Sequence, residues 1–234
     1  MKNIKRWVRG ALAGPVFGLL ALAAVPGANA AVVYNNGSPN QANANNLGIV
    51  LQADDFVLSG TTTITDVHFW SLEAAGDYRG GIFWALALNA GGSPGAFVAS
   101  GLQTVVARAA TGINALGFAE FQIDFNLNAP VNLAAGTYWL VLHNGARTNL
   151  GDPNDFYWET TANNATVRGR ESDDNAVSWT SNGNEHAFFL TGNAAGVVPE
   201  PATALILATG LVGLLGMRRK NLRKNGKQTT SREI

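Results

Sequence analysis

Hydrophobic and polar residues alternate along much of the middle of the chain, and segment 121–127 shows the pattern most clearly. An alternation with a period of two is typical of a β-strand that has one face in a core. The residues that would face the core are Phe121, Ile123, Phe125 and Leu127. Other short segments of strand-like composition are predicted as strands as well: 32–34, 56–58, 62–71, 82–89, 103–109, 137–143, 156–160, 166–169 and 187–191.

Segments rich in Gly, Pro and Asn separate these strands at short intervals and predict turns. They are 91–95, 128–130, 135–136 and 152–154. No part of 31–196 carries the apolar stripe of an amphipathic helix. Many short strands joined by turns are typical of antiparallel sheets. We therefore predict an all-β domain over 31–196 with the fold of a jelly-roll-like antiparallel β-sandwich.

The N-terminus has the three parts of a Sec signal peptide. Four basic residues precede an apolar run over 11–25, and small residues at Ala28 and Ala30 follow it. This arrangement predicts that signal peptidase removes 1–30 and leaves Ala31 as the first residue of the mature chain.

A second apolar segment, near the C-terminus, predicts a transmembrane helix over 202–217. Basic residues favour the cytoplasmic side of a membrane span, so the basic tail 221–234 is predicted to be cytoplasmic. The residues that flank the span are Pro199, Glu200 and Pro201 on one side and Arg218 and Arg219 on the other.

The order of this proline–glutamate–proline motif, the apolar segment and the arginine pair resembles the PEP-CTERM sorting signal of Gram-negative bacteria, over 197–220. The resemblance implies recognition by an exosortase, a protease-transpeptidase embedded in the inner membrane. The protein would be held in that membrane transiently and then reach the cell surface or extracellular matrix, where such proteins accompany exopolysaccharide. The family usually ends soon after the arginines, whereas this chain continues through 221–234.

The domain 31–196 also resembles a loosely defined group of exported β-domains that precede the same sorting signal. The resemblance implies a β fold and an exported location, and it supplies no catalytic residue. The segments that carry the resemblance are 33–37, 53–56, 69–70, 135–140 and 156–159.

Charge is distributed unevenly along the chain, although the formal net charge is zero. Segment 31–196 has five basic and fourteen acidic residues, a net charge of −9, and no lysine. This acidity gives no indication of a nucleic-acid partner. The chain has no cysteine, which excludes a disulfide framework, a cysteine-based zinc site and a thiol nucleophile.

The sequence contains no convincing catalytic motif, and we predict a protein that is not an enzyme. Segment 91–95 fits the G-x-S-x-G pattern of a nucleophile elbow, but Pro94 lacks the backbone N–H that the oxyanion hole needs. The histidines lack the spacing of metal ligands and are predicted to be hydrogen-bonded residues in or beside strands. They are His68, His143 and His186.

Acidic clusters near predicted turns suggest a structural calcium site, because Ca²⁺ prefers carboxylate and carbonyl oxygens. The clusters are Asp54-Asp55, 152–155 and 171–174. Asp152 and Asp155 are the best candidate ligands. The alternative is that these acidic turns only keep the surface soluble. No other cofactor is predicted.

Aromatic residues suggest a glycan-binding alternative, because exposed aromatic rings often mark binding surfaces. Tyr157, Trp158 and Trp179 lie in polar sequence surroundings and are the candidate exposed rings. Trp84 and Trp139 lie in strongly apolar strands and are predicted to fill the core.

We therefore predict an exported, non-enzymatic protein of the cell surface or extracellular matrix, with a structural or adhesive role in exopolysaccharide or biofilm. The alternative is a glycan-binding module that calcium could stabilise. A secreted hydrolase and an ice-binding protein are remote alternatives. Ice binding needs a flat, regular face of threonines, and 61–63 is the only run of three threonines in the chain. The predicted partners are exosortase, signal peptidase, the inner membrane and an extracellular polysaccharide.

Overall fold

The computed structural model describes residues 30–162 and 169–194, all of which belong to one compact unit of the chain, Ala28–Pro199. No helix in these ranges is long and apolar enough to cross a membrane. The first strand begins at Ala31, the residue predicted to start the mature chain.

Predictions for both ends of the chain fall outside the described residues. They concern Ala28 of the cleavage site, the sorting residues Pro199, Glu200, Pro201, Arg218 and Arg219, the transmembrane helix 202–217 and the tail 221–234.

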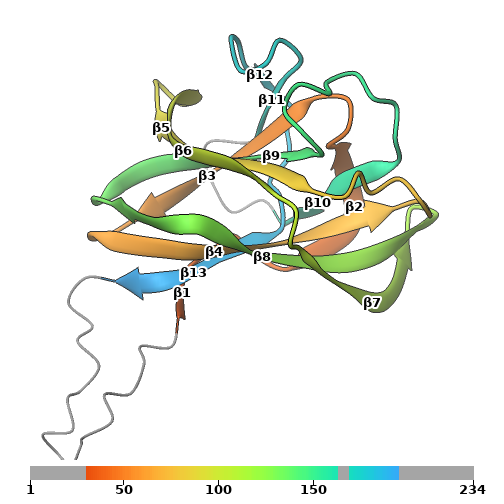
Figure 1. Cartoon of the computed structure of the whole chain (residues 1–234), viewed down its shortest axis with the longest axis horizontal. Coiled ribbons are helices and arrows are strands. Elements are labelled where there is room, and N and C mark those ends of the chain that lie inside the picture. The colour runs from red at the N-terminus through yellow and green to blue at the C-terminus, as the bar shows by residue number, and fades with distance from the viewer. Residues whose placement is uncertain (1–29, 163–168, 195–234) are drawn as a thin grey trace, which may run out of the picture. The chain divides into compact units, whose positions relative to one another are not determined.

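The described residues form two antiparallel sheets and no helix, which is consistent with the predicted sandwich (Figure 1). The jelly-roll topology stays a prediction. The seven-stranded sheet contains β1 (Ala31–Asn35), β2 (Pro39–Asn46), β4 (Thr62–Glu73), β7 (Ala107–Ala115), β8 (Phe118–Leu133), β10 (Phe156–Thr161) and β13 (Phe188–Ala194). The six-stranded sheet contains β3 (Leu51–Leu58), β5 (Ile82–Asn89), β6 (Pro94–Gln103), β9 (Gly136–Asn144), β11 (Arg170–Ser172) and β12 (Thr180–Ser181).

Strand β4 is the centre of the seven-stranded sheet, because both of its edges are paired. One edge pairs with β8, and β8 pairs in turn with β7. The other edge is shared by β13, opposite 62–69, and β10, opposite 71–73. Strands β1 and β2 extend the sheet beyond β13 and β10. The six-stranded sheet has the order β12-β11-β3-β9-β5-β6.

Large apolar side chains from both sheets form one main core. The alternation predicted for 121–127 is confirmed, because Ile123, Phe125 and Leu127 are buried and Phe121 packs half-buried against them. A smaller apolar cluster around Trp139 joins alternate residues of β3, β5 and β9. These three strands are therefore largely buried on both faces, which explains the nearly continuous apolar runs in β5 and β9.

The predicted turn at 128–130 is wrong, because these residues lie inside β8. The pairing of β8 with β4 is shifted here by a bulge between Asn126 and Val131. A bulge leaves residues outside the ladder of hydrogen bonds, so it can accept Pro130, which has no N–H to donate.

Four strands are absent from the predicted set: β2, β6 and the short strands β11 and β12. Strand β2 is almost entirely polar, and β6 is rich in Gly, Ala and Ser, so neither has a clear apolar alternation. The predicted strand 103–109 is interrupted, because it spans the connection between β6 and β7. The predicted strand 166–169 falls mainly on residues outside the described ranges, and Gly169 itself is not in a strand.

Candidate functional site

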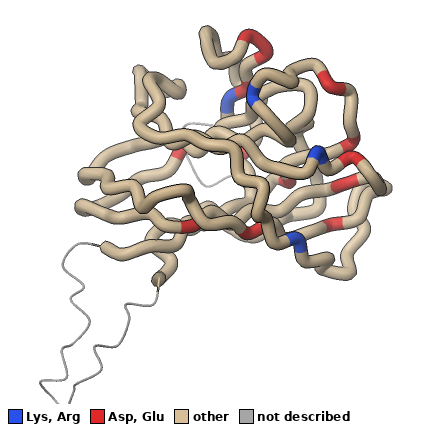
Figure 2. Tube along the Cα trace, in the orientation of Figure 1, with Lys and Arg blue, Asp and Glu red and all other residues tan. Residues whose placement is uncertain are grey.

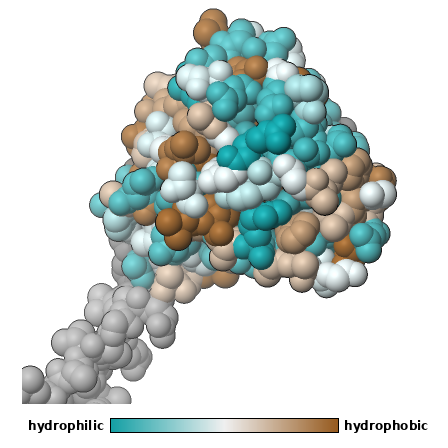
Figure 3. Space-filling view, turned by 45° about the vertical axis from the view of Figure 1, so that its right-hand side comes forward, coloured by the Kyte–Doolittle hydropathy of each residue, from teal (hydrophilic) through white to brown (hydrophobic). Residues whose placement is uncertain are grey.

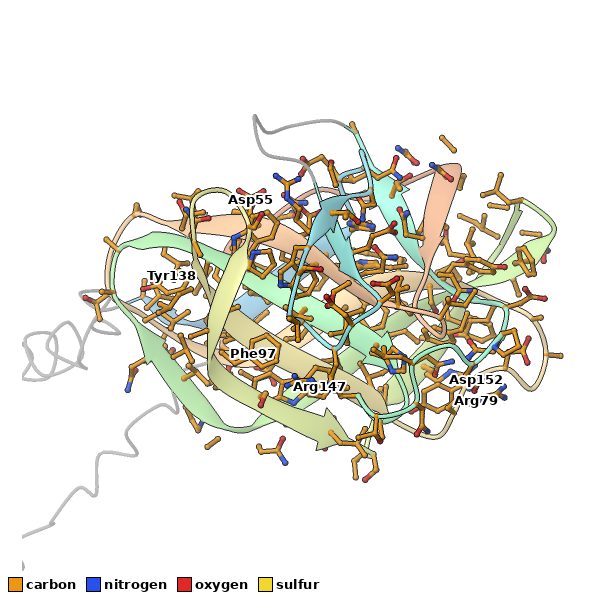
Figure 4. All side chains as sticks on the ribbon, turned by 90° about the horizontal axis from the view of Figure 1, so that it is seen from above. Asp55, Arg79, Phe97, Tyr138, Arg147 and Asp152 are labelled. Carbon is orange, nitrogen blue, oxygen red and sulfur yellow. The ribbon has the colours of Figure 1, made fainter. Side chains whose placement is uncertain are left out.

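Three acidic side chains gather at one place in the domain: Asp54 and Asp55 on β3, and Glu185 just before β13 (Asp55 is labelled in Figure 4). One carboxylate oxygen from each lies within 4.8 Å of the others. The exposed fractions are 0% for Asp54, 7% for Asp55 and 2% for Glu185. We call these three residues the carboxylate cluster.

Strand pairing explains why the cluster forms at this point of β3. Strand β11 pairs with β3 only as far as Ala53, so the next two residues lie past the end of that pairing. The segment between β12 and β13 occupies the position instead. There the backbone N–H of His186 donates to Asp54 Oδ2 at 2.5 Å. The Asn36 side-chain amide donates to the same oxygen at 3.2 Å and to the His186 carbonyl at 2.9 Å.

Asp54 is well supplied with hydrogen bonds, but the other two carboxylates are not. Both oxygens of Glu185 and Oδ1 of Asp55 are buried without a hydrogen-bond partner. Asn36 and Asp54 are near enough to influence the pKa of Glu185, yet they do not meet hydrogen-bond geometry with it. Buried polar atoms are nearly always paired, so three unpaired acceptors in one cluster require an explanation.

Burial is the largest cause of the raised pKa values in the cluster. Burial and the charges of Asp54 and Asp55 raise the pKa of Glu185 to about 8. Burial also raises the pKa of Asp54 well above its usual value, and it raises that of Asp55 against the opposing charge of Arg170. Two carboxylates 4.8 Å apart repel each other by about 3 kcal/mol at an effective dielectric constant of 20. The cluster therefore needs protons or a cation to compensate its charge.

The buried His186 ring lies beside the cluster and stacks on Trp158. The His186 ring is fully buried, with Nδ1 3.3 Å from Asp54 Oδ2 and Nε2 3.1 Å from Asn45 Oδ1. Burial lowers the pKa of His186 to about 3, so the ring is neutral at physiological pH. Its centroid lies 4.5 Å from that of Trp158 in a stacked arrangement.

A second acidic pair, Glu120 and Glu159, is held by hydrogen bonds from Gln41, although Glu159 Oε2 is buried without a partner. The Gln41 backbone N–H donates to Glu159 Oε1 at 3.0 Å, and its side-chain amide donates to Glu120 Oε2 at 3.1 Å. Burial and the neighbouring Glu120 raise the pKa of Glu159 to about 8. One glutamine thus joins β2 to both β8 and β10.

Asp152 and Asp155, the predicted calcium ligands, have other partners in the structure. Arg79 donates to both oxygens of Asp152, at 2.5 and 3.0 Å, and the two side chains lie side by side in Figure 4. Asp155 Oδ1 accepts a hydrogen bond of 2.7 Å from the Tyr157 hydroxyl. Calcium binding here stays a prediction, in which the ion would compete with Arg79.

The predicted aromatic ligand-binding residues have three different environments. Trp158 is fully buried, so the expectation of an exposed ring is wrong; its polar neighbours along β10 are themselves buried. Tyr157 is half-buried, and its ring centroid lies 5.2 Å from that of Phe118. Trp179 is half-buried against the Trp139 cluster. Glycan binding by Tyr157 or Trp179 stays a prediction.

The core role of Trp84 and Trp139 is confirmed, since they are 2% and 0% exposed.

The histidines were expected to be hydrogen-bonded residues in or beside strands, and this is also confirmed. His68 on β4 lies 2.6 Å from Asp124, and His143 on β9 lies 3.2 Å from the Gly48 carbonyl.

Sequence reasoning missed the carboxylate cluster as a unit, although Asp54-Asp55 was one of the acidic pairs that it identified. The pair was expected in a turn, whereas it lies in the middle of β3. Glu185 is distant in sequence and had no signal of its own. The available signal was the position of two acidic residues between the apolar residues Leu51, Ala53, Phe56 and Leu58 of one strand.

Comparison with known protein families identifies a sorting motif in the C-terminal segment. Residues 197–220 match the PEP-CTERM protein-sorting motif. No curated protein matches the chain. The chain is therefore a β-rich domain followed by a PEP-CTERM sorting motif, the signal of an exported protein that exosortase processes.

Proposed function

We propose that this chain is a non-enzymatic protein of the cell surface or extracellular matrix, with a structural or adhesive role in exopolysaccharide or biofilm. The PEP-CTERM motif at 197–220 carries the proposal, because it directs a protein to exosortase at the membrane. Signal peptidase would first remove 1–30. The apolar segment 202–217 would then hold the chain in the inner membrane until exosortase acts.

The charge of the domain supports a location in water outside the cell. Acidic residues outnumber basic ones along the described trace (Figure 2). Three of the arginines are engaged with neighbouring groups: Arg79 with Asp152, Arg108 with Glu73, and Arg147 with Asn175. A domain with excess negative charge resists self-association, and it would need bridging cations to approach an anionic polysaccharide.

The surface in Figure 3 also suits a domain that is surrounded by water. Hydrophobic groups on this face are interrupted by hydrophilic ones. The most exposed large apolar residues of the described ranges, Val105 and Val177, lie in different connections between strands. Scattered apolar residues of this kind are normal on a soluble domain.

Changing Pro199-Glu200-Pro201 to three alanines tests the proposal. We expect the variant to stay in the membrane fraction, because exosortase would no longer recognise it, while the unchanged chain reaches the surface or medium. Immunoblotting of cell fractions measures the distribution. Pro153→Ala, in an exposed loop of the domain, is the matched control and should be sorted normally. Equal release of the triple-alanine variant would refute the proposal.

Glycan binding is the second candidate function. It is favoured by Tyr157 and Trp179, which are half-buried and not fully enclosed by the domain. The two lie in different parts of the structure, Tyr157 on β10 and Trp179 beside β12. In this role the domain would attach the exported protein to polysaccharide.

A further inference from the structure

We propose that the carboxylate cluster of Asp54, Asp55 and Glu185 binds one calcium ion. The choice of calcium over other cations rests on the proposed export, since calcium is plentiful outside the cell. The geometry of the cluster is independent of that location.

The first argument is the set of oxygen atoms that face one another. Three carboxylates contribute oxygens within 4.8 Å, a separation that allows one ion to contact all of them. Each of the three side chains is more than nine-tenths buried. Both Glu185 oxygens and Asp55 Oδ1 lack hydrogen-bond donors, so their lone pairs are available to a metal.

The second argument concerns charge. Three carboxylates would carry three negative charges in a site that excludes water. Arg170 is the nearby cation that opposes the charge of Asp55, but its guanidinium also donates to the Gly92 carbonyl at 2.8 Å and to Ser93 Oγ at 3.2 Å. A divalent ion together with this arginine would bring the site close to neutrality.

The chemistry of the ligands selects the kind of ion. The cluster offers hard carboxylate oxygens and no thiolate, a donor set that suits Ca²⁺ or Mg²⁺ rather than a soft metal. Ca²⁺ accepts irregular coordination and both monodentate and bidentate carboxylates, whereas Mg²⁺ demands nearly ideal octahedral geometry. Three carboxylates on an extended strand and a loop give an irregular arrangement, which favours Ca²⁺.

Bound calcium would join segments that are distant in sequence. Asp54 and Asp55 belong to the six-stranded sheet, while Glu185 precedes β13 of the seven-stranded sheet. Asn36, which donates to Asp54, directly follows β1, the partner of β13. Strand β13 ends at Ala194, three residues before the sorting motif begins. Calcium would therefore stabilise the strand pair from which the sorting segment extends.

The test measures calcium binding by the full chain, purified in detergent and stripped with EGTA. We expect calorimetric titration with CaCl₂ to give one bound ion per chain. The melting temperature should rise by about 5–10 °C when calcium exceeds the dissociation constant 100-fold. No heat of binding and an unchanged melting temperature would overturn the proposal. Because binding is measured on purified protein, this result does not depend on whether the chain is exported.

Substitutions in the carboxylate cluster test whether calcium binds there. Glu185→Gln keeps the side-chain volume and should abolish the calcium-dependent rise in melting temperature. In EGTA the variant should melt at a temperature no lower than that of the unchanged chain. Asp173→Asn, at an exposed acidic residue outside the cluster, is the matched control and should keep the full response. If Glu185→Gln fails to fold, Asp55→Asn provides the same test. A response that survives in the cluster variants but disappears in Asp152→Asn would overturn the assignment.

Discussion

Replacing Trp158 with alanine is expected to lower the free energy of unfolding by about 3–5 kcal/mol, the usual cost of removing a large aromatic side chain from a core. The indole ring is fully buried and packs against Phe69, His186 and Phe188, with centroid separations of 6.1, 4.5 and 5.7 Å. Its Nε1–H also donates to the Ala187 carbonyl at 3.0 Å, and without the indole this acceptor would keep only the 3.4 Å hydrogen bond from the Trp70 backbone N–H.

Thermal unfolding followed by near-ultraviolet circular dichroism measures this effect. The expected loss corresponds to a fall in melting temperature of about 10 °C. Trp179→Ala is the control, because that ring is half-buried at the edge of the smaller cluster and should cost clearly less. Two variants of equal stability would contradict the core role of Trp158.

The second large effect is expected for Arg108→Ala, which should lower the free energy of unfolding by about 2–3 kcal/mol, less than the roughly 3–5 kcal/mol of a fully buried pair because the Arg108 side chain is 30% exposed. Arg108 on β7 forms an ion pair with Glu73 on β4, whose side chain is only 2% exposed. The guanidinium also lies 4.4 Å from the ring centroid of Tyr78 and 4.9 Å from that of Phe121. Removing it would leave a buried carboxylate with only the 2.6 Å hydrogen bond from Ser71.

A double-mutant cycle separates the ion pair from the ring contacts. Glu73→Gln in the Arg108→Ala background should recover part of the lost stability, because it removes the uncompensated charge. Urea unfolding of the four proteins measures the coupling. If the two substitutions were strictly additive, the ion pair would have no energetic role.

The sandwich could be predicted because hydrophobic burial leaves a local pattern. Segment 121–127 alternates as a strand with one buried face, and β9 is apolar over 138–142 because both of its faces are buried there. Strand β2 leaves no such pattern. Its position is fixed by hydrogen bonds to distant residues, for example from the Asn40 side chain to the Thr161 carbonyl at 2.8 Å.

The candidate site could be predicted only in part, because contacts between distant segments bring its residues together. The acidic pair Asp54-Asp55 is visible in the sequence, but its position in a strand depends on pairing with β9. Glu185 joins it only because β11 ends its pairing with β3 at Ala53. Likewise, Trp158 has polar neighbours in sequence, and only the tertiary fold buries Glu159 and Thr160 beside it.

The most direct test of exosortase-dependent export compares the same producing cells with and without their exosortase. Mass spectrometry of the surface and medium fractions measures both the amount of the chain and its ends. With exosortase present, we expect a chain that begins at Ala31 and yields no peptides from 221–234. Without it, we expect the chain to stay in the membrane fraction with its C-terminus intact. Equal amounts of the same species outside both kinds of cell would contradict the proposed function.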